Sequence, residues 1–266
     1  MVHVPKHRPR SGLAERTIAE ALRSLAMPLG CPVAYLEQQR AALVQRLCAE
    51  EASLPPVVRT FVRHDVGLVS LPCPDQMPLT LDPADVQELI AFTRLEAEPG
   101  TNLTLAGARL TVKAEPAGVR IADAGTISEA RACSAMLVYE PGRASLDELR
   151  SDVSHTEWDD HACEDSATHR VGAMHGGVLV ALASVERPHG QLARIRVLVS
   201  PTFRQSGLGR LVMRTLAQRV LAQGLFPYVR LTTTDLAARA LSSTVGFVGF
   251  ARTLTWQVSP TMVAFA

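Results

Sequence analysis

Val197-Leu198-Val199-Ser200-Pro201-Thr202-Phe203-Arg204-Gln205-Ser206-Gly207-Leu208-Gly209-Arg210 is the stretch that decides the fold. An apolar run typical of a strand passes into a short polar turn with two glycines, and an apolar-periodic helix follows. The free N–H groups of a helix's first turn and the helix dipole make such a junction an anion site, usually for phosphate. Gly207 and Gly209 let backbone and ligand approach closely. Arg204 and Arg210 are placed to add charged hydrogen bonds to phosphate oxygens.

Three kinds of phosphate loop begin in this way. A P-loop requires a lysine, and none stands near this turn. A dinucleotide fingerprint requires glycine or alanine at position 212, where this chain has Val212 and so departs from the pattern. It also requires an acidic residue about twenty positions after the loop. The third pattern is Arg/Gln-x-x-Gly-x-Gly/Ala, and Arg204, Gly207 and Gly209 fill its fixed positions. It resembles the pyrophosphate loop of the GCN5-related N-acetyltransferases (GNAT), which bind acyl-coenzyme A. Glycine turns between strand and helix also occur for purely structural reasons.

A second motif of the same family follows at the expected separation. Residues 226–234 are typical of a strand, and a helix pattern ending in Gly-Phe comes next. The residues that match the family pattern are Ala238, Leu241, Gly246 and Phe247. Asp235 stands where the family usually has Asn, and Ser242 where it usually has Tyr.

The resemblance implies an α/β (α+β) fold, a mixed and mostly antiparallel sheet flanked by helices. It implies transfer of an acetyl group from acetyl-coenzyme A to a primary amine of a small molecule, peptide or protein. In this family the sheet splays beside the fourth strand, and the pantetheine pairs with that strand's backbone while the pyrophosphate lies on the loop amides. The implied coenzyme-binding residues are Leu198, Val199, Arg204, Gln205, Ser206, Gly207, Leu208, Gly209, Arg210 and Asp235.

The chemistry also needs a base for the amine, a donor for the oxyanion and an acid for the leaving thiolate. The family's usual oxyanion donor is a backbone N–H near Val199. Many members carry a glutamate on the fourth strand, but residues 191–200 contain Arg194 and Arg196 and no carboxylate. The candidate bases are Glu186, Glu157, Asp159, His169 and His175, and each has a second interpretation as a solvated surface group. We assign Glu186 as the base and Ser242 as the residue at the acid position. Serine is a poor acid, but a thiol of pKa about 8.5 departs with little help.

These departures leave two hypotheses open. The first is a working N-acetyltransferase. The second is a weak or inactive acyl-coenzyme A-binding module with a regulatory role. Arg194 and Arg196 favour an anionic part of the acceptor or of coenzyme A, or they point into solvent.

The rest of the chain divides at Pro116-Ala117-Gly118 into an N-terminal region, 1–117, and the transferase domain, 118–266. The N-terminal region contains no motif that indicates a catalytic or binding function. It is either a degenerate partial copy of the same unit or an unrelated extension. Its patterns predict helices over 11–27, 32–52 and 82–98, strands over 57–71 and a hairpin over 102–113. The second domain is predicted to hold a first strand at 119–123, a helix from Thr126 or Ser128 through Met136 and Leu137, and a helix capped by Ser145 over 146–153. A polar loop at 155–165, a hairpin over 169–185, a strand over 191–200 and one or two strands up to 258 complete it.

Composition limits the classes of binding partner that the sequence predicts. The net charge of +1 gives no electrostatic argument for nucleic acid or membrane, and no apolar run reaches the length of a membrane span. The five cysteines are scattered, which predicts reduced thiols in a cytoplasmic protein. The spacing of His155, His161 and Cys163 fits no familiar zinc site, so no metal is expected. The carboxylates of 155–165 are alternatively the lining of a pocket for a cationic amine. We expect a monomer or a homodimer.

Overall fold

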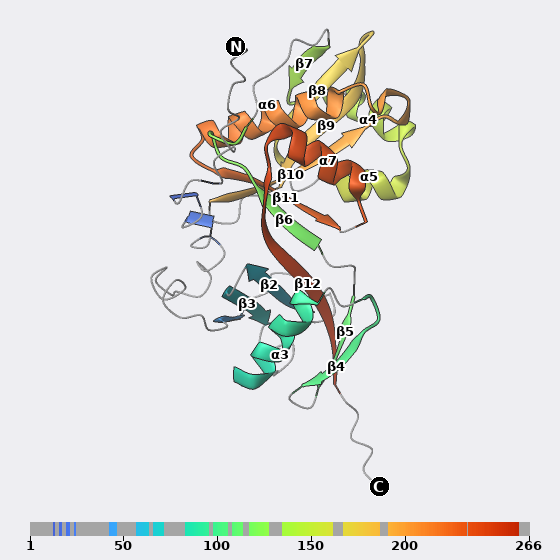
Figure 1. Cartoon of the computed structure of the whole chain (residues 1–266). Helices are drawn as coiled ribbons and strands as arrows, with labels where there is room; N and C mark the ends of the chain where they lie inside the picture. Colours follow the sequence, from blue (N-terminus) through green and yellow to red (C-terminus); the bar gives the residue numbers. More distant parts are fainter. Residues whose placement is uncertain are drawn as a thin grey trace, which may run out of the picture. The chain divides into compact units, whose positions relative to one another are not determined.

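The computed structural model describes residues 13, 16, 17, 20, 21, 24, 43–46, 57–63, 66–71, 83–95, 98–105, 108–113, 117–127, 135–161, 167–186, 191–232 and 234–260. The chain divides into two compact units, each assembled from separate segments (Figure 1). Unit 1 comprises Met1–Ala21, Arg120–Val229 and Ala237–Val248. Unit 2 comprises Leu22–Val119, Arg230–Leu236 and Gly249–Ala266.

The sheet of unit 1 has the strand order β11-β10-β9-β8-β7. These strands are β7 (Met136–Tyr139), β8 (Ala167–His175), β9 (Val178–Glu186), β10 (Leu192–Val199) and β11 (Phe226–Thr232). The pairs from β7 to β10 are antiparallel, whereas β10 and β11 run parallel. The mixed, mostly antiparallel sheet confirms the predicted fold class.

Helices cover both faces of this sheet (Figure 1). Helices α4 (Arg143–Asp152) and α5 (His155–His161) contribute Leu149 and Trp158 to a buried cluster that includes Leu198 of β10. Helix α6 (Leu208–Ala222) approaches Val197 and Val199 of the same strand. Because successive side chains of a strand point to opposite faces, α6 lies on one face and α4 with α5 on the other.

Helix α7 (Leu236–Val245) ends on the glycine of the second sequence motif. Gly246 has φ +116°, and the N–H groups of Gly246 and Phe247 donate to the Ser242 carbonyl at 3.1 and 2.9 Å. A Cβ on Gly246 would lie 1.9 Å from the Thr126 carbonyl oxygen. The Gly-Phe pair is therefore a helix C-cap that also permits a close backbone contact.

Unit 2 contains a second set of strands, most of which pair antiparallel. A long strand, β12 (Val248–Pro260), pairs antiparallel with β2 (Val57–Arg63) and with β5 (Ala108–Val112). Strand β3 (Val66–Leu71) extends the sheet beyond β2, and β4 (Asn102–Leu105) extends it beyond β5. Strand β1 (Leu43–Arg46) runs parallel to β3.

Helix α3 (Pro83–Arg94) joins unit 2 through buried aromatic and hydroxyl contacts. The rings of Phe92 and Trp256 pack edge to face with their centroids 6.1 Å apart. The Thr60 and Thr93 hydroxyls lie 2.5 Å apart, and the Trp256 indole N–H donates to Thr60 at 3.3 Å. The buried indole N–H of Trp256 therefore has a hydrogen-bond acceptor within unit 2.

Several predicted elements are confirmed. They include the strands at 57–71, the hairpins at 102–113 and 169–185, the strand at 191–200, and the helices that follow the two motifs. Arg16, Thr17, Glu20, Ala21 and Ser24 are helical, in agreement with the helix predicted over 11–27. The predicted basic lead-in at 1–10 lies outside the described residues.

Other predictions of secondary structure are wrong. Leu43–Arg46 is a strand within the helix predicted over 32–52, whose other residues lie outside the described ones. Met136 and Leu137 belong to strand β7, because pairing with Met174 and Ala173 of β8 outweighs a short helical spacing. The first strand predicted at 119–123 is, in contrast, confirmed as β6 (Ala117–Ile121). Helix α4 begins after Gly142 rather than at Ser145, and His155–His161 is a helix rather than a loop.

Among the residues that the structure describes, no helix combines the length and the apolar character that crossing a bilayer would require.

Candidate active site

The loop between β10 and α6 is held in an unusual backbone conformation. Pro201–Phe203 form a single 3-10 turn, and Gln205 and Gly207 both have positive φ values, 64° and 87°. Gly207 is the N-cap of α6 and offers no side-chain cap. Positive φ at Gln205 is uncommon outside glycine, so the loop is strained where the sequence predicts a ligand.

The turn presents a row of free backbone donors. Within the described part of the chain, no acceptor bonds the N–H groups of Gln205, Gly207, Leu208, Gly209 and Arg210. The Leu211 N–H begins the helical ladder by donating to the Gly207 carbonyl at 3.1 Å. The Ser206 N–H differs from the predicted set, because it donates to the Phe203 carbonyl at 3.4 Å. The remaining amides and the α6 dipole suit a pyrophosphate.

Among the described residues, the edge of strand β10 nearest this loop has no pairing partner. Its parallel ladder with β11 ends at Arg194 opposite Tyr228, although β10 continues to Val199. On its other edge the Ser200 N–H donates to the Val180 carbonyl at 2.9 Å. In an antiparallel ladder the hydrogen-bonded pairs alternate, so Leu198 bonds β9 while Val197 and Val199 direct their backbone groups away from it. The backbone groups of Leu198 therefore face β9, and those of Val197 and Val199 face the unpaired edge; the coenzyme roles of Leu198 and Val199 stay predictions.

The two glycines of the first motif serve different purposes. Gly207 supplies the positive φ that the loop requires. A Cβ on Gly209 would lie 3.1 Å from Val199 Cγ2 and 3.6 Å from Leu241 Cδ2. Gly209 thus permits α6 to pack closely on β10 and α7, which is a packing role in addition to the predicted approach of a ligand.

Arg204 joins the loop to helix α5. Its Nη2 donates to Glu157 Oε1 at 2.5 Å, and its Nε donates to the Val199 carbonyl at 3.4 Å. The guanidinium that was predicted to meet phosphate is thus also an ion-pair partner of a candidate base. Both side chains are half-exposed.

Glu157 belongs to a capping box at the start of α5. The Ser154 hydroxyl donates to Glu157 Oε2 at 3.0 Å, and the Glu157 N–H donates back to the Ser154 hydroxyl at 3.2 Å. The Ser154 hydroxyl bond, followed by the bonds and charge of Arg204, lowers the pKa of Glu157 below its ordinary value. A carboxylate so stabilised is a weak proton acceptor.

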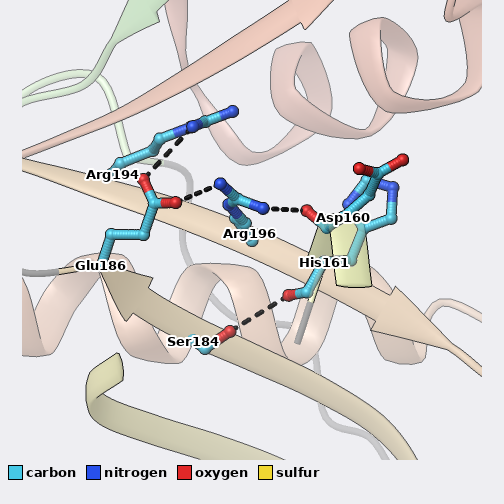
Figure 2. A network of polar contacts seen from close by, with 6 residues as sticks. All are labelled: Asp160, His161, Ser184, Glu186, Arg194 and Arg196. Carbon is cyan, nitrogen blue, oxygen red and sulfur yellow. Dashed lines mark hydrogen bonds and ion pairs between the residues drawn. The ribbon is translucent and has the colours of Figure 1, made fainter. Parts of the chain in front are cut away.

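Glu186 lies between two arginines at the other end of β10 (Figure 2). Arg194 Nη1 donates to Glu186 Oε2 at 3.2 Å, and Arg196 Nη2 donates to Glu186 Oε1. Arg196 Nη1 also donates to the Asp160 carbonyl, and the Ser184 hydroxyl donates to the His161 carbonyl at 3.2 Å. The last two bonds cap the C-terminal carbonyls of α5.

Ser242 is fully buried in α7. Its hydroxyl donates to the Arg239 carbonyl one turn earlier, at 3.0 Å. Serine commonly makes this bond inside helices. The acid role of Ser242 stays a prediction, and its contacts are those of a structural residue.

The other candidate residues are spread over unit 1. His175 lies near the loop, with its ring 5.1 Å from that of Phe203. His169 contacts Glu140 and Gln223 at the far end of α6, about 22 Å away along a helix of 15 residues. Asp159 pairs with His155 at 3.3 Å. Asp235 directly precedes α7 and belongs to unit 2, so its coenzyme role stays a prediction.

Two features of the site were missed in the sequence. The spacing Ser154-x-x-Glu157 is a capping-box signature that indicates the start of α5. Ser184 and the α5 carbonyls carry no local signal, because they meet only in the folded sheet. Across the described residues, no group of three or more His, Cys, Asp or Glu side chains is arranged to hold a metal ion.

The chain is similar to known acetyltransferases over part of its length. Residues 137–247 match the model of the Acetyltransferase (GNAT) family. Similar solved structures include a GNAT-family acetyltransferase from Colwellia psychrerythraea, with 12% identity, a TM-score of 0.47, and coverage of 76% of this chain and 65% of that one. The ribosomal-protein-S18-alanine N-acetyltransferase from Escherichia coli has 16% identity, a TM-score of 0.35, and coverage of 48% and 96%. No curated protein sequence matches the chain. The match to the family model confirms, for residues 137–247, the resemblance to the GNAT family of acetyltransferases.

Proposed function

We propose that this protein is an N-acetyltransferase that transfers the acetyl group of acetyl-coenzyme A directly to a primary amine. The observation that carries the proposal is the continuity of two sets of free backbone groups. The open edge of β10 ends at Val199, and the free amides of Gln205 and Gly207 to Arg210 follow on the same loop. Together they match the two polar parts of coenzyme A, the pantetheine amides and the pyrophosphate.

The reaction forms one bond and breaks one. The neutral amine attacks the thioester carbonyl, the new C–N bond forms, and the C–S bond breaks. The amine loses a proton, and the sulfur gains one to leave as the thiol. The Val199 N–H, on the open edge of β10, is the donor proposed for the negative charge that develops on the carbonyl oxygen.

One observation favours the second hypothesis, a binding module with little turnover. Glu186 accepts bonds from two arginines, and the Ser242 hydroxyl is fully buried. Neither predicted catalytic side chain is in a position typical of a free acid or base. Turnover with acetyl-coenzyme A and an amine separates the two functions, since both require the coenzyme loop.

The test is calorimetric titration of acetyl-coenzyme A into the wild type and a Ser206→Glu variant. Ser206 is exposed in the loop, so a carboxylate there repels phosphate without entering the core. We expect the variant to bind at least about tenfold more weakly, a loss of about 1.4 kcal/mol. Ser151→Glu, an equal change on the exposed face of α4, is the control and should bind as the wild type does. Absence of binding by the wild type would overturn the coenzyme assignment.

A further inference from the structure

The start of β10 carries an arrangement that the coenzyme site does not use. By alternation, the side chains of Arg194, Arg196 and Leu198 lie on the face opposite Val197 and Val199. Helix α6 approaches the valine face, whereas Leu198 is covered by α4 and α5. Arg194 and Arg196 remain 25% and 20% exposed on their face. A molecule that approaches the open edge of β10 from the side away from α6 therefore meets the two arginines.

The charges of this cluster do not balance. Among the described residues, two guanidinium groups share the carboxylate of Glu186. Arg196 is fixed by Glu186 and by the Asp160 carbonyl, and its Nε is buried with no partner in the described structure. The Asp160 carboxylate points away from Arg196 (Figure 2). Counted over the described residues, one positive charge of this cluster has no carboxylate of its own in a partly buried place, and an added anion would stabilise it.

Arg194 is the residue of this cluster whose guanidinium N–H groups can bind an added anion. Within the described part of the chain, its Nη1 donates to Glu186, and its other terminal nitrogen points away from the network (Figure 2). A guanidinium presents a planar fork of N–H groups that matches a carboxylate. Glu186 holds this fork in place from one side, so the second side is preorganised for another anion.

We propose that Arg194, oriented by Glu186 and Arg196, binds a carboxylate of the acceptor, so that the preferred substrate is a small primary amine that also carries a carboxylate. The inference rests on the proposed acetyltransferase function and deepens it. Glu186 then acts as a positioning residue for Arg194 rather than as the base. Residues 194 and 199 are separated by about 17 Å of strand, at about 3.3 Å per residue, which bounds the spacing of the two substrate groups.

The experiment compares ω-amino carboxylic acids of increasing length with the ω-amino amides of the same length. Each pair offers a similar amine and differs in one charge. We expect kcat/KM for the best acid to exceed that for its amide by at least about tenfold, as a charge-assisted hydrogen bond implies. In Arg194→Gln this ratio should fall close to one, mainly through KM, and the affinity for acetyl-coenzyme A should hold. Arg143→Gln removes one exposed positive charge from α4 and should keep the wild-type ratio.

Several outcomes would overturn the inference. These are equal use of acids and amides by the wild type, a preference that survives Arg194→Gln, or a loss of acetyl-coenzyme A affinity in that variant, which would assign Arg194 to the coenzyme. Arg194→Lys guards against a folding defect, since it keeps the charge without the fork and should retain part of the preference. If the wild type binds acetyl-coenzyme A without turnover, calorimetry of the acids and amides on the coenzyme A-bound protein decides the matter. Failure to bind acetyl-coenzyme A would instead contradict the proposed function.

Discussion

The two ends of strand β10 offer different kinds of hydrogen-bond donor. At its C-terminal end, Val199 and the loop to α6 offer backbone N–H groups, and glycines make the conformation possible. At its start, Arg194 and Arg196 offer charged side chains that Glu186 holds in place. A backbone N–H group is present at any residue except proline, whereas a side chain changes with every substitution. Under the proposed function, the first end binds acetyl-coenzyme A and the second end selects the acceptor.

This contrast predicts that glycine substitutions are costly to stability, and that substitutions of charged residues mainly change recognition. The largest effect is expected at Gly246. In Gly246→Ala, a methyl group would lie 1.9 Å from the Thr126 carbonyl oxygen at a φ of +116°. We expect a loss of about 3 kcal/mol or more in the free energy of unfolding, measured by urea denaturation. Gly249→Ala, where a Cβ meets nothing within 4 Å, should change stability little. Equal stability of the two variants would contradict the close contact.

The next effect concerns Gly209 of the coenzyme loop. The Cβ of Gly209→Ala would lie 3.1 Å from Val199 Cγ2, so α6 must move or the valine must yield. We expect a loss of about 1–2 kcal/mol, the usual range for overpacking. The double variant with Val199→Ala removes the contacting methyl group and should show a favourable coupling energy in a double-mutant cycle. Strictly additive losses would mean that the packing of α6 on β10 is not the cause.

A smaller loss of stability is expected when Glu186 or Glu157 is replaced. Glu186 is 22% exposed and serves two arginines, while Glu157 is 37% exposed and pairs with Arg204 alone. We expect Glu186→Gln to cost about 2 kcal/mol, and Glu157→Gln less than about 1 kcal/mol, because a glutamine also fits a capping box. Thermal unfolding at low and high salt measures both losses. A larger loss in Glu157→Gln would reverse this ranking of the two ends of β10.

The smallest expected effect is a change in the pKa of Glu157. The Ser154 hydroxyl bond is the main cause that lowers the pKa of Glu157, so Ser154→Ala should raise that pKa toward the ordinary carboxyl range. Because the pKa is lower in the folded state, the linked stabilisation is present above the unfolded-state pKa and is lost as the pH falls through the folded value. Carboxyl-carbon NMR titration measures the change. Ser151→Ala, which removes a hydroxyl bond within α4, should leave the Glu157 titration unchanged.

Sequence reasoning succeeded where the determining interactions are local. The loop, helix α6 and the hairpin of β8 and β9 follow from glycine positions and apolar periodicity within a few residues. It failed at Met136–Tyr139, which long-range pairing with β8 makes a strand. It also failed at His155–His161, although the capping box of Ser154 and Glu157 that starts this helix is a local signal.

The sequence by itself therefore determined the family fold and the place of the coenzyme loop, since a positive φ and a close helix contact require glycine at particular positions. Only the tertiary structure decided which charged side chains meet. Glu186 lies 10 residues from Arg196, and Glu157 lies 47 residues from Arg204. Such pairs form because the register of β9 on β10 and the packing of α5 bring them together, and neither is encoded in a local pattern.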